Sequence, residues 1–340
     1  MKLLVQIPCL DEENDIRSVI SSIPKKIDGV DSIDILVIDD GSTDNTVDVA
    51  IQSGADLIIK KHRRKGLAHS FKLGQLYFLT RDYDILVNTD GDNQYFQAKI
   101  PELIQPLLAG EADIVIGDRE TGSLSHFSAI KRLLQRIGSM VVSYVAGAKI
   151  PDAASGFRAY SRLAVSKLFI TKRFSYAMES IIQAGNKGLR LVSIPTGARE
   201  VSRPSRLFTS TFQHVRLSGV AILKSALMYR PAQIFTWFSL LLFISGLVPM
   251  VRYLVLVYSG VAGDRIQSLI LGSLLITTSI MSLVLGLVAE LSRIHRELFE
   301  EERSIERLSS PPTLEAVLTS YSAELFFARK KRPAVINPRK

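Results

Sequence analysis

Residues 85–94 read Ile-Leu-Val-Asn-Thr-Asp-Gly-Asp-Asn-Gln, an apolar run that ends in two aspartates on a glycine-containing turn. A short β-branched run predicts a buried strand, and the polar residues after it mark the strand's carboxyl end. Asp90 and Asp92 stand two residues apart, so both carboxylates can point toward one ion. Oxygen ligands without a nearby His or Cys suit Mg²⁺ or Mn²⁺ rather than zinc. We therefore predict a divalent metal at Asp90 and Asp92, with Gln94 as a further oxygen ligand.

Similar apolar runs recur through the N-terminal part of the chain, at residues 3–7, 35–38, 57–59, 114–116 and 191–194. Longer stretches with helical spacing lie between them, at residues 14–23, 46–53 and 67–79. Alternation of strands and helices predicts an α/β fold with a mainly parallel, doubly wound sheet. In such sheets the ligand binds beyond the carboxyl ends of the strands.

The polar clusters fall where that rule requires. Residues 8–14 and 39–44 are acidic stretches that follow the first and second strands, and Gly-Asp-Arg at 117–119 follows the fifth. One carboxylate at a strand end is commonly a helix N-cap, whereas repeated clusters at one edge indicate a shared site. The chain has no Walker loop and no GxGxxG after the first strand, which argues against a kinase or a dinucleotide enzyme.

Two apolar segments, residues 234–258 and 266–289, are long enough to cross a membrane. At about 1.5 Å per residue, each covers a hydrocarbon core of roughly 30 Å. The short loop 259–265 makes them a hairpin with both chain ends on one side. Basic residues flank the hairpin on that side: Arg216, Lys224, Arg230, Arg293 and Arg296. The positive-inside rule therefore places the large N-terminal part, and both termini, in the cytoplasm.

We divide the chain accordingly into a catalytic domain at residues 1–205, amphipathic interfacial helices at 206–232, the hairpin at 233–290 and a tail at 291–340. The segment before the hairpin has apolar residues at helical spacing with basic residues among them, typical of a helix in the headgroup layer. Packing of this helix on the catalytic domain is the alternative. For the tail, membrane contact, oligomer contact or no specific role all remain open.

The formal net charge of +9 calls for an anionic partner, either nucleic acid, phosphorylated small molecules or a lipid surface. No nucleic-acid module or basic stripe with interleaved aromatics is present, so we expect no nucleic-acid partner. The single cysteine, Cys9, excludes an internal disulfide and a CxxC metal site.

Six motifs in order over residues 3–206 resemble family 2 glycosyltransferases of the GT-A fold, in the branch of polyprenyl- and dolichyl-phosphate sugar synthases. They are Pro8-x-x-Asp-Glu-Glu, Asp39-Asp-Gly-Ser-Thr-Asp44, Asp90-Gly-Asp-x-Gln94, Gly117-Asp-Arg119, Asp152-x-x-Ser-Gly-Phe-Arg158 and Glu179 within Ala-Met-Glu-Ser. The resemblance implies transfer of a hexose from a nucleoside-diphosphate sugar, UDP- or GDP-linked, to a polyisoprenyl phosphate, with Mg²⁺ or Mn²⁺ as cofactor.

The resemblance also implies residue roles. Catalytic roles fall to Asp92, Arg119 and Glu179. The nucleotide-sugar would bind Pro8, Leu10, Glu12, Val37, Asp39, Asp90, Gly91 and Asp92, with Arg199, Arg203 and Arg206 in a late basic motif that closes over the donor. The acceptor phosphate would bind Arg119, Lys131, Arg132, Arg136 and Arg158.

A phosphate acceptor is chemically consistent with this set of residues. A phosphate monoester has a second pKa of about 6, so it is mostly dianionic at neutral pH and needs no base to attack. The enzyme must instead bring two anionic groups together, which requires a metal on the leaving diphosphate and arginines on the acceptor. In-line attack at the anomeric carbon would invert its configuration. A solvated helix face remains an alternative for residues 131–136.

Three other functions remain open from the sequence. A processive polysaccharide synthase would carry a Gln-x-x-Arg-Trp motif, but the only tryptophan, Trp237, lies inside the first apolar segment. A transferase to a lipid hydroxyl would need Glu179 or a neighbour as base. A non-catalytic membrane scaffold would not need Asp90, Asp92 and Arg119. Homo-oligomerisation is compatible with every one of these functions.

Overall fold

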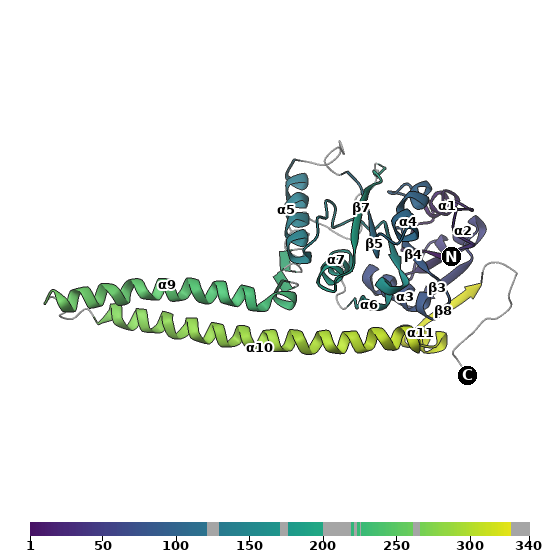
Figure 1. Cartoon of the computed structure of the whole chain (residues 1–340). Helices are drawn as coiled ribbons and strands as arrows, with labels where there is room; N and C mark the ends of the chain where they lie inside the picture. The colour runs from purple at the N-terminus through teal and green to yellow at the C-terminus, as the bar shows by residue number, and fades with distance from the viewer. Residues whose placement is uncertain are drawn as a thin grey trace. The chain divides into compact units, whose positions relative to one another are not determined.

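The computed structural model describes residues 1–120, 129–170, 176–199, 219–220, 223–224, 226–260 and 266–327, and the side chains of residues 129–135 lie outside that description. The chain forms two compact units, residues 1–222 with 301–340, and residues 223–300. The first unit is built on one sheet and the second on a helical hairpin (Figure 1).

An eight-stranded sheet in the order β7-β5-β6-β4-β1-β2-β3-β8 forms the centre of the first unit. Strand β1 lies parallel between β2 and β4, β2 is parallel to β3, and β5 is parallel to β7, whereas β6 and β8 are antiparallel to their neighbours. The mainly parallel α/β sheet predicted from the sequence is confirmed. The strands are β1 (Lys2–Cys9), β2 (Ser32–Asp39), β3 (Leu57–Lys61), β4 (Ile85–Asn88), β5 (Ile114–Asp118), β6 (Arg158–Ser161), β7 (Leu191–Pro195) and β8 (Ala323–Phe327).

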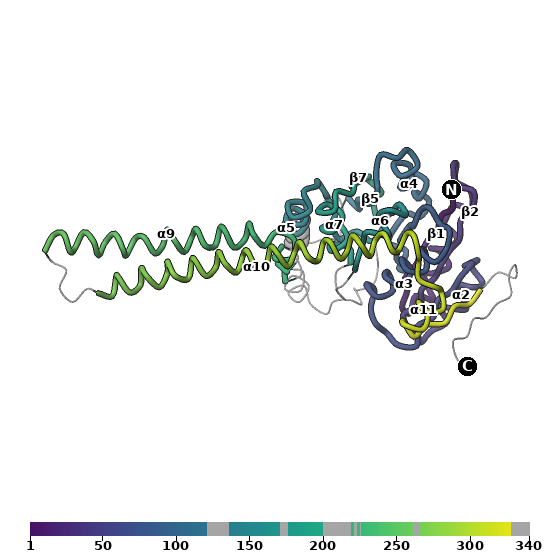
Figure 2. Tube along the Cα trace, turned by 60° about the horizontal axis from the view of Figure 1, so that its bottom comes forward, coloured from purple at the N-terminus to yellow at the C-terminus, as the bar shows by residue number. Residues whose placement is uncertain are grey.

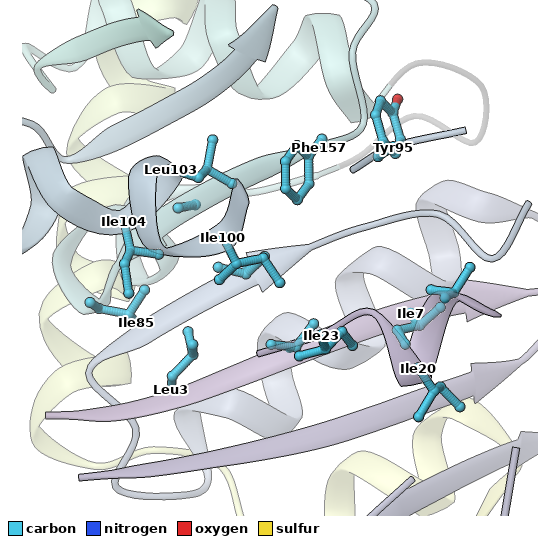
Figure 3. Packing of buried hydrophobic residues seen from close by; sticks show 14 of the residues in the cluster. Leu3, Ile7, Ile20, Ile23, Ile85, Tyr95, Ile100, Leu103, Ile104 and Phe157 are labelled. Atoms are coloured by element: carbon cyan, nitrogen blue, oxygen red, sulfur yellow. The ribbon is translucent and has the colours of Figure 1, made fainter. Parts of the chain in front are cut away.

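One face of the sheet packs against α1 (Ile16–Ser21), α2 (Thr46–Ser53) and α4 (Ile100–Leu108). Alternate residues of β1, Leu3, Val5 and Ile7, point into this core because side chains alternate across a strand. Figure 3 shows Ile20 of α1 and Ile104 of α4 in the same cluster. The continuous apolar strands therefore hold the polar loops at their ends in a fixed place.

The opposite face carries α3 (Leu67–Leu79), with α6 (Arg162–Lys167) and α7 (Tyr176–Asn186) in contact with it. Helix α3 lies so close to the sheet that a Cβ on Gly74 would stand 1.8 Å from Oε1 of Gln6. Helix α5 (Ala129–Ala146) packs on α7. Helices on both faces complete the doubly wound arrangement.

The C-terminal segment returns to the same sheet. Helix α11 (Leu314–Tyr321) contacts α3, and β8 pairs antiparallel with β3, with Lys61 opposite Ala323 (Figures 1 and 2). Leu318 and Leu325 are buried, and burial of such a side chain contributes about 1.5–3 kcal/mol. Residues 291–340, treated in the sequence as one tail, are thus divided between the two units, and residues 323–327 form a strand of the first unit's sheet.

The second unit is a hairpin of two apolar helices, α9 (Pro231–Tyr258) and the first part of α10 (Gln267–Ser309). Both are long and apolar enough to cross a membrane. Ser239 and Ser279 hydrogen-bond each other's backbone carbonyls at 2.9 and 2.8 Å, and a Cβ on Gly246 would lie 3.1 Å from the carbonyl of Gly272. Small residues at a helix contact are typical of packing in lipid.

The interfacial segment predicted at 206–232 lies largely outside the described residues. Its described end belongs to the hairpin unit, where the Arg296 guanidinium lies 4.4 Å from the centre of the Tyr229 ring and donates to the Met228 carbonyl at 3.0 Å. Helix α10 continues well beyond the expected span end at residue 289. Its last residues, from Glu301 onward, belong to the first unit, and within that unit Arg307 lies 3.9 Å from the Phe169 ring centre.

His69 lies on α3 against Tyr321, and burial, together with the charges of Lys61 and Lys65, lowers its pKa to about 4. An unfolded histidine takes up its proton near pH 6.5. As the pH falls from about 6.5 to 4, the unfolded state therefore binds this proton first, and the free energy of unfolding declines. We predict that His69→Gln removes this part of the decline, measured as melting temperature against pH.

The comparison isolates His69 because every other titrating group is shared by the two proteins. A difference in melting temperature between wild type and variant that stays constant from pH 7 to pH 4.5 would contradict the assignment.

Candidate active site

The carboxyl ends of β1, β2 and β4 lie side by side, and the loops that follow them are linked by hydrogen bonds. The Thr46 hydroxyl accepts from the Glu12 amide at 2.7 Å, and Oδ1 of Asp11 accepts from the Thr43 amide at 2.8 Å. A Cβ on Gly91 would lie 3.1 Å from Cβ of Cys9. The acidic clusters that the sequence places after separate strands therefore form one site.

Strained backbone gathers at the same edge. Asp11, Asn93 and Glu120 follow β1, β4 and β5, and each has a positive φ of 52–55°. Among the described non-glycine residues only Ser322 shares this conformation. Left-handed φ in non-glycine residues costs free energy and is enriched at functional sites. The three residues turn the chain sharply enough to hold the loops over the strand ends.

Asp90 is the most unusual group of the site. Its Oδ1 is buried and has no hydrogen-bond partner among the residues that the structure describes, while Oδ2 accepts from Nε2 of Gln94 at 3.0 Å. Burial, together with the charge of Asp92 and against the opposing charge of Arg119, raises the pKa of Asp90 to about 7. An unpartnered buried carboxylate beside a second one is the environment that a cation would complete.

Mg²⁺ or Mn²⁺ fits this pair of carboxylates. No group of three or more His, Cys, Asp or Glu side chains gathers as a metal site within the described part of the chain. Two carboxylates leave coordination positions for water and for diphosphate oxygens, as is usual for Mg²⁺. Gln94 approaches Asp90 through its amide nitrogen, so in this arrangement it orients Asp90 rather than presenting an oxygen beside it.

A buried hydrogen-bond network, not predicted from the sequence, holds the backbone that packs against Asp90. The amide of Asn88 accepts from Gln6 at 2.8 Å and donates to the Gly156 carbonyl at 2.7 Å. The Gly156 amide in turn donates to the Tyr95 hydroxyl at 2.7 Å. These contacts join β1, β4 and the segment before β6, and they fix Gly156 directly against the carboxylate.

Arg119 is oriented by Asp152. Its Nε and Nη2 donate to the two carboxylate oxygens of Asp152 at 2.7 and 3.0 Å. The Asp152 side chain is 1% exposed and that of Arg119 is 14% exposed. A bidentate pair of this kind fixes the plane of the guanidinium. Asp152 belongs to the motif at 152–158, but its partner 33 residues earlier is not evident from local sequence.

Arg158 does not lie where the sequence analysis placed it. This residue is fully buried, and its guanidinium donates to the carbonyls of Ala153, Ser155 and Ala177 and to the Ser180 hydroxyl. Its hydrogen-bonding capacity is therefore used to tie β6 to α7. The prediction that Arg158 binds the acceptor phosphate is wrong, and its role is structural.

One donor-site prediction, that for Val37, also needs correction, whereas the donor-binding role of Arg199 stays a prediction. Val37 is fully buried in the hydrophobic core, so it supports Asp39 rather than touching a nucleoside. Arg199 donates to backbone carbonyls of Asn93 and Tyr95 and stacks 4.8 Å from the centre of the Phe96 ring. It therefore clamps the loop that carries Asp92, while Arg203 and Arg206 lie outside the described residues.

The remaining predicted residues are placed as follows. Pro8 and Asp39 are buried at the ends of β1 and β2, Leu10 is half-buried, and Oδ2 of Asp39 lacks a partner within the described chain. Glu179 is buried on α7 and accepts from Gln183 at 3.4 Å. Arg136 is exposed on α5, and the side chains of Lys131 and Arg132 lie outside the description. The roles predicted for Glu179 and for the α5 cations stay predictions.

Comparison with known proteins agrees with this geometry. Residues 4–169 match Glycosyl transferase family 2. The chain carries a family 2 glycosyltransferase domain. This stretch contains most of β1 and all of β2 to β6, and it includes Asp90, Asp92, Arg119 and Asp152. The family expected from the six motifs is confirmed, as are the GT-A fold and the enzymatic class.

Two relatives of the domain are named as sugar transferases that use lipid phosphates. The chain is 26% identical over 205 residues to an undecaprenyl-phosphate mannosyltransferase of Micrococcus luteus, covering 57% of this chain and 82% of the relative. It is 27% identical over 205 residues to a dolichyl-phosphate hexose transferase of Haloferax volcanii, covering 60% and 86%. Glucosyl-3-phosphoglycerate synthase of Mycobacterium tuberculosis, solved with Mn²⁺, UDP-glucose and phosphoglyceric acid, superposes with a TM-score of 0.51 at 24% identity, covering 66% and 78%. The likeness to this structure concerns the fold.

We predict that Gly156→Ala weakens Mn²⁺ binding by about 10- to 100-fold without unfolding the protein. A Cβ at this position would lie 2.7 Å from Oδ2 of Asp90, so the carboxylate must move. Electron paramagnetic resonance of bound Mn²⁺ measures the change. Gly138→Ala is the matched control because a Cβ there meets nothing within 4 Å; equal binding by both variants would contradict the packing argument.

The raised pKa of Asp90 predicts a pH-dependent metal affinity. Below about pH 7 the carboxyl group holds a proton that a cation must displace, so Mn²⁺ affinity should fall by up to about tenfold per pH unit. Above about pH 7 the affinity should level off. A Mn²⁺ titration from pH 5.5 to 8 tests this, and an affinity that is flat across that range would show that Asp90 is already ionised.

Proposed function

We propose that this glycosyltransferase moves a hexose from a nucleoside-diphosphate sugar, UDP- or GDP-linked, to a polyisoprenyl phosphate such as dolichyl or undecaprenyl phosphate. The observation that carries the proposal is the buried Asp90 carboxylate with an unpartnered oxygen, beside Asp92, in a chain that continues into an apolar hairpin. The first feature suits a metal-bound diphosphate, and the second brings the domain to an acceptor that cannot leave the bilayer. The names of the relatives support the same acceptor class.

In this proposal Asp90 and Asp92 would hold Mg²⁺ or Mn²⁺, which neutralises the charge that develops on the leaving diphosphate. Asp39 would bind the nucleoside through its unpartnered Oδ2. Arg119, held in one plane by Asp152, would face both the donor and the acceptor phosphate.

The acceptor phosphate attacks the anomeric carbon as the nucleoside diphosphate departs from the opposite side, so the configuration inverts. Because the acceptor is already anionic, no side chain needs to remove a proton from it. The basic residues of α5, Lys131, Arg132 and Arg136, would hold this phosphate. Glu179 would orient the acceptor or the sugar.

The connectivity supports a cytoplasmic site with both chain ends on the same side. Residues 1–222 and 301–340 form one unit, so the chain leaves that unit before the hairpin and rejoins it afterwards. The chain must then cross the membrane an even number of times. Arg230 before the hairpin and Arg293 after it agree with the positive-inside rule.

We predict that purified full-length protein with Mn²⁺ transfers sugar from one member of a panel of UDP-, GDP- and dTDP-sugars to undecaprenyl or dolichyl phosphate. Chelation with EDTA should abolish transfer, and the corresponding unphosphorylated alcohol should not be glycosylated. Asp92→Asn should lower turnover by at least about 100-fold, because the leaving diphosphate loses its charge stabilisation.

Asp82→Asn provides the matched control, since the side chain of Asp82 is exposed and pairs with Lys2 at the surface. Undiminished turnover in EDTA, or preference for the free alcohol over its phosphate, would disprove the proposed reaction.

A further inference from the structure

We propose that the C-terminal segment, residues 314–327, is a positioning element of the donor site: it anchors the basic loop His62-Arg-Arg-Lys-Gly66 beside the nucleoside-diphosphate. The inference rests on the proposed function, because it concerns the same donor. It assigns to α11 and β8 a task in substrate binding, although they follow the hairpin in sequence and lie beyond the family 2 match at 4–169.

The start of this loop is held by β8. Strand β3 ends at Lys61, opposite Ala323, and the next residue, His62, donates its backbone amide to the Ser322 carbonyl at 3.3 Å. Nε2 of His62 also lies 3.6 Å from Oε1 of Glu324. The first residue of the loop therefore contacts the C-terminal segment through both its backbone and its side chain.

The end of the loop is held by Asp40, at the end of β2. The two carboxylate oxygens of Asp40 accept from the amides of Lys65 and Gly66 at 2.9 and 2.7 Å. The buried ammonium of Lys61 pairs with the same carboxylate and donates to the Ser70 hydroxyl at 2.8 Å. Asp40 thus ties together the last residue of β3 and the last residues of the loop.

The helix that follows the loop is held by α11. The Tyr321 ring packs against His69, in the first turn of α3, with ring centres 4.5 Å apart. Tyr321 is 9% exposed, and the neighbouring Val317 and Leu318 are also buried. Ser322, with φ of 48°, turns the chain from α11 into β8, so that one short segment contacts both the first residue of the loop and the helix that follows the loop.

The loop borders the predicted donor site. Gly41, which follows Asp39 and Asp40, has a φ of +88°, and a Cβ on it would lie 3.4 Å from the backbone nitrogen of Arg64. The side chains of Arg63, Arg64 and Lys65 are exposed at this position. Three adjacent cations repel one another, and fixing their backbone in one conformation costs entropy. The contacts that hold both ends of the loop offset that cost in the free protein. An anionic diphosphate therefore binds to a loop that is already ordered, and it binds more tightly.

The test compares two glutamates of the same segment. Glu324 lies beside His62, whereas Glu315 is exposed on the first turn of α11. We predict that Glu324→Gln and Tyr321→Ala raise the Kd for UDP or GDP, measured by calorimetry with Mn²⁺, by about 3- to 10-fold. The KM for donor sugar should rise by the same factor with kcat and the acceptor KM unchanged. Glu315→Gln should bind as wild type does, and Tyr321→Phe, which keeps the ring contact, should restore binding.

Hydrogen exchange distinguishes positioning from general destabilisation. Amides of residues 62–66 should exchange faster in Glu324→Gln, while those of β1 and β4 stay protected. Wild-type affinity in Glu324→Gln and Tyr321→Ala, or an equal loss in Glu315→Gln, would overturn the inference. If Tyr321→Ala does not fold, Glu324→Gln decides alone. If the wild-type protein binds neither nucleoside diphosphate with Mn²⁺, the proposed function fails instead.

Discussion

The carboxylate of Asp90 is the group on which the rest of the site depends. A buried anion with an unpartnered oxygen is unfavourable, and the protein retains it beside Asp92, with Arg119 opposing the repulsion. The arrangement is stable only because rigid surroundings prevent the side chain from turning to solvent. Gly156 leaves room for it, Gln94 donates to it, and the Asn88 network fixes the backbone behind it. The same constraint leaves the oxygen available to a cation.

The sheet supplies the rigidity that this arrangement requires. Strand β1 lies between β2 and β4, so the loops that carry Glu12, Asp39 and Asp90 emerge at one edge. The antiparallel strand β6 separates β4 from β5 and brings Arg158 and its hydrogen bonds to α7 into the interior. Asp152, a few residues before β6, can therefore reach Arg119 after β5. The strand order thus brings together residues that are far apart in sequence.

The hairpin does not end the catalytic unit. After α9 and α10 the chain adds α11 and β8 to the outer edge of the sheet, beyond β3. An edge strand exposes unpaired backbone groups, and β8 covers those of β3. The hairpin is consequently an insertion within the chain of this unit, because the chain enters the hairpin from it at residue 222 and returns to it at residue 301.

Local pattern alone was sufficient for the α/β class, six of the strands, the acidic clusters and the two apolar helices, since burial and period are properties of neighbouring residues. Strand β8 was not predicted, because a short segment after a long charged helix carries no local sign of its distant partner. The roles of Arg158 and Val37 were misassigned for a related reason. Residue type and motif position indicate that a group is charged or apolar, but only the tertiary structure decides whether backbone carbonyls, the core or solvent surround it.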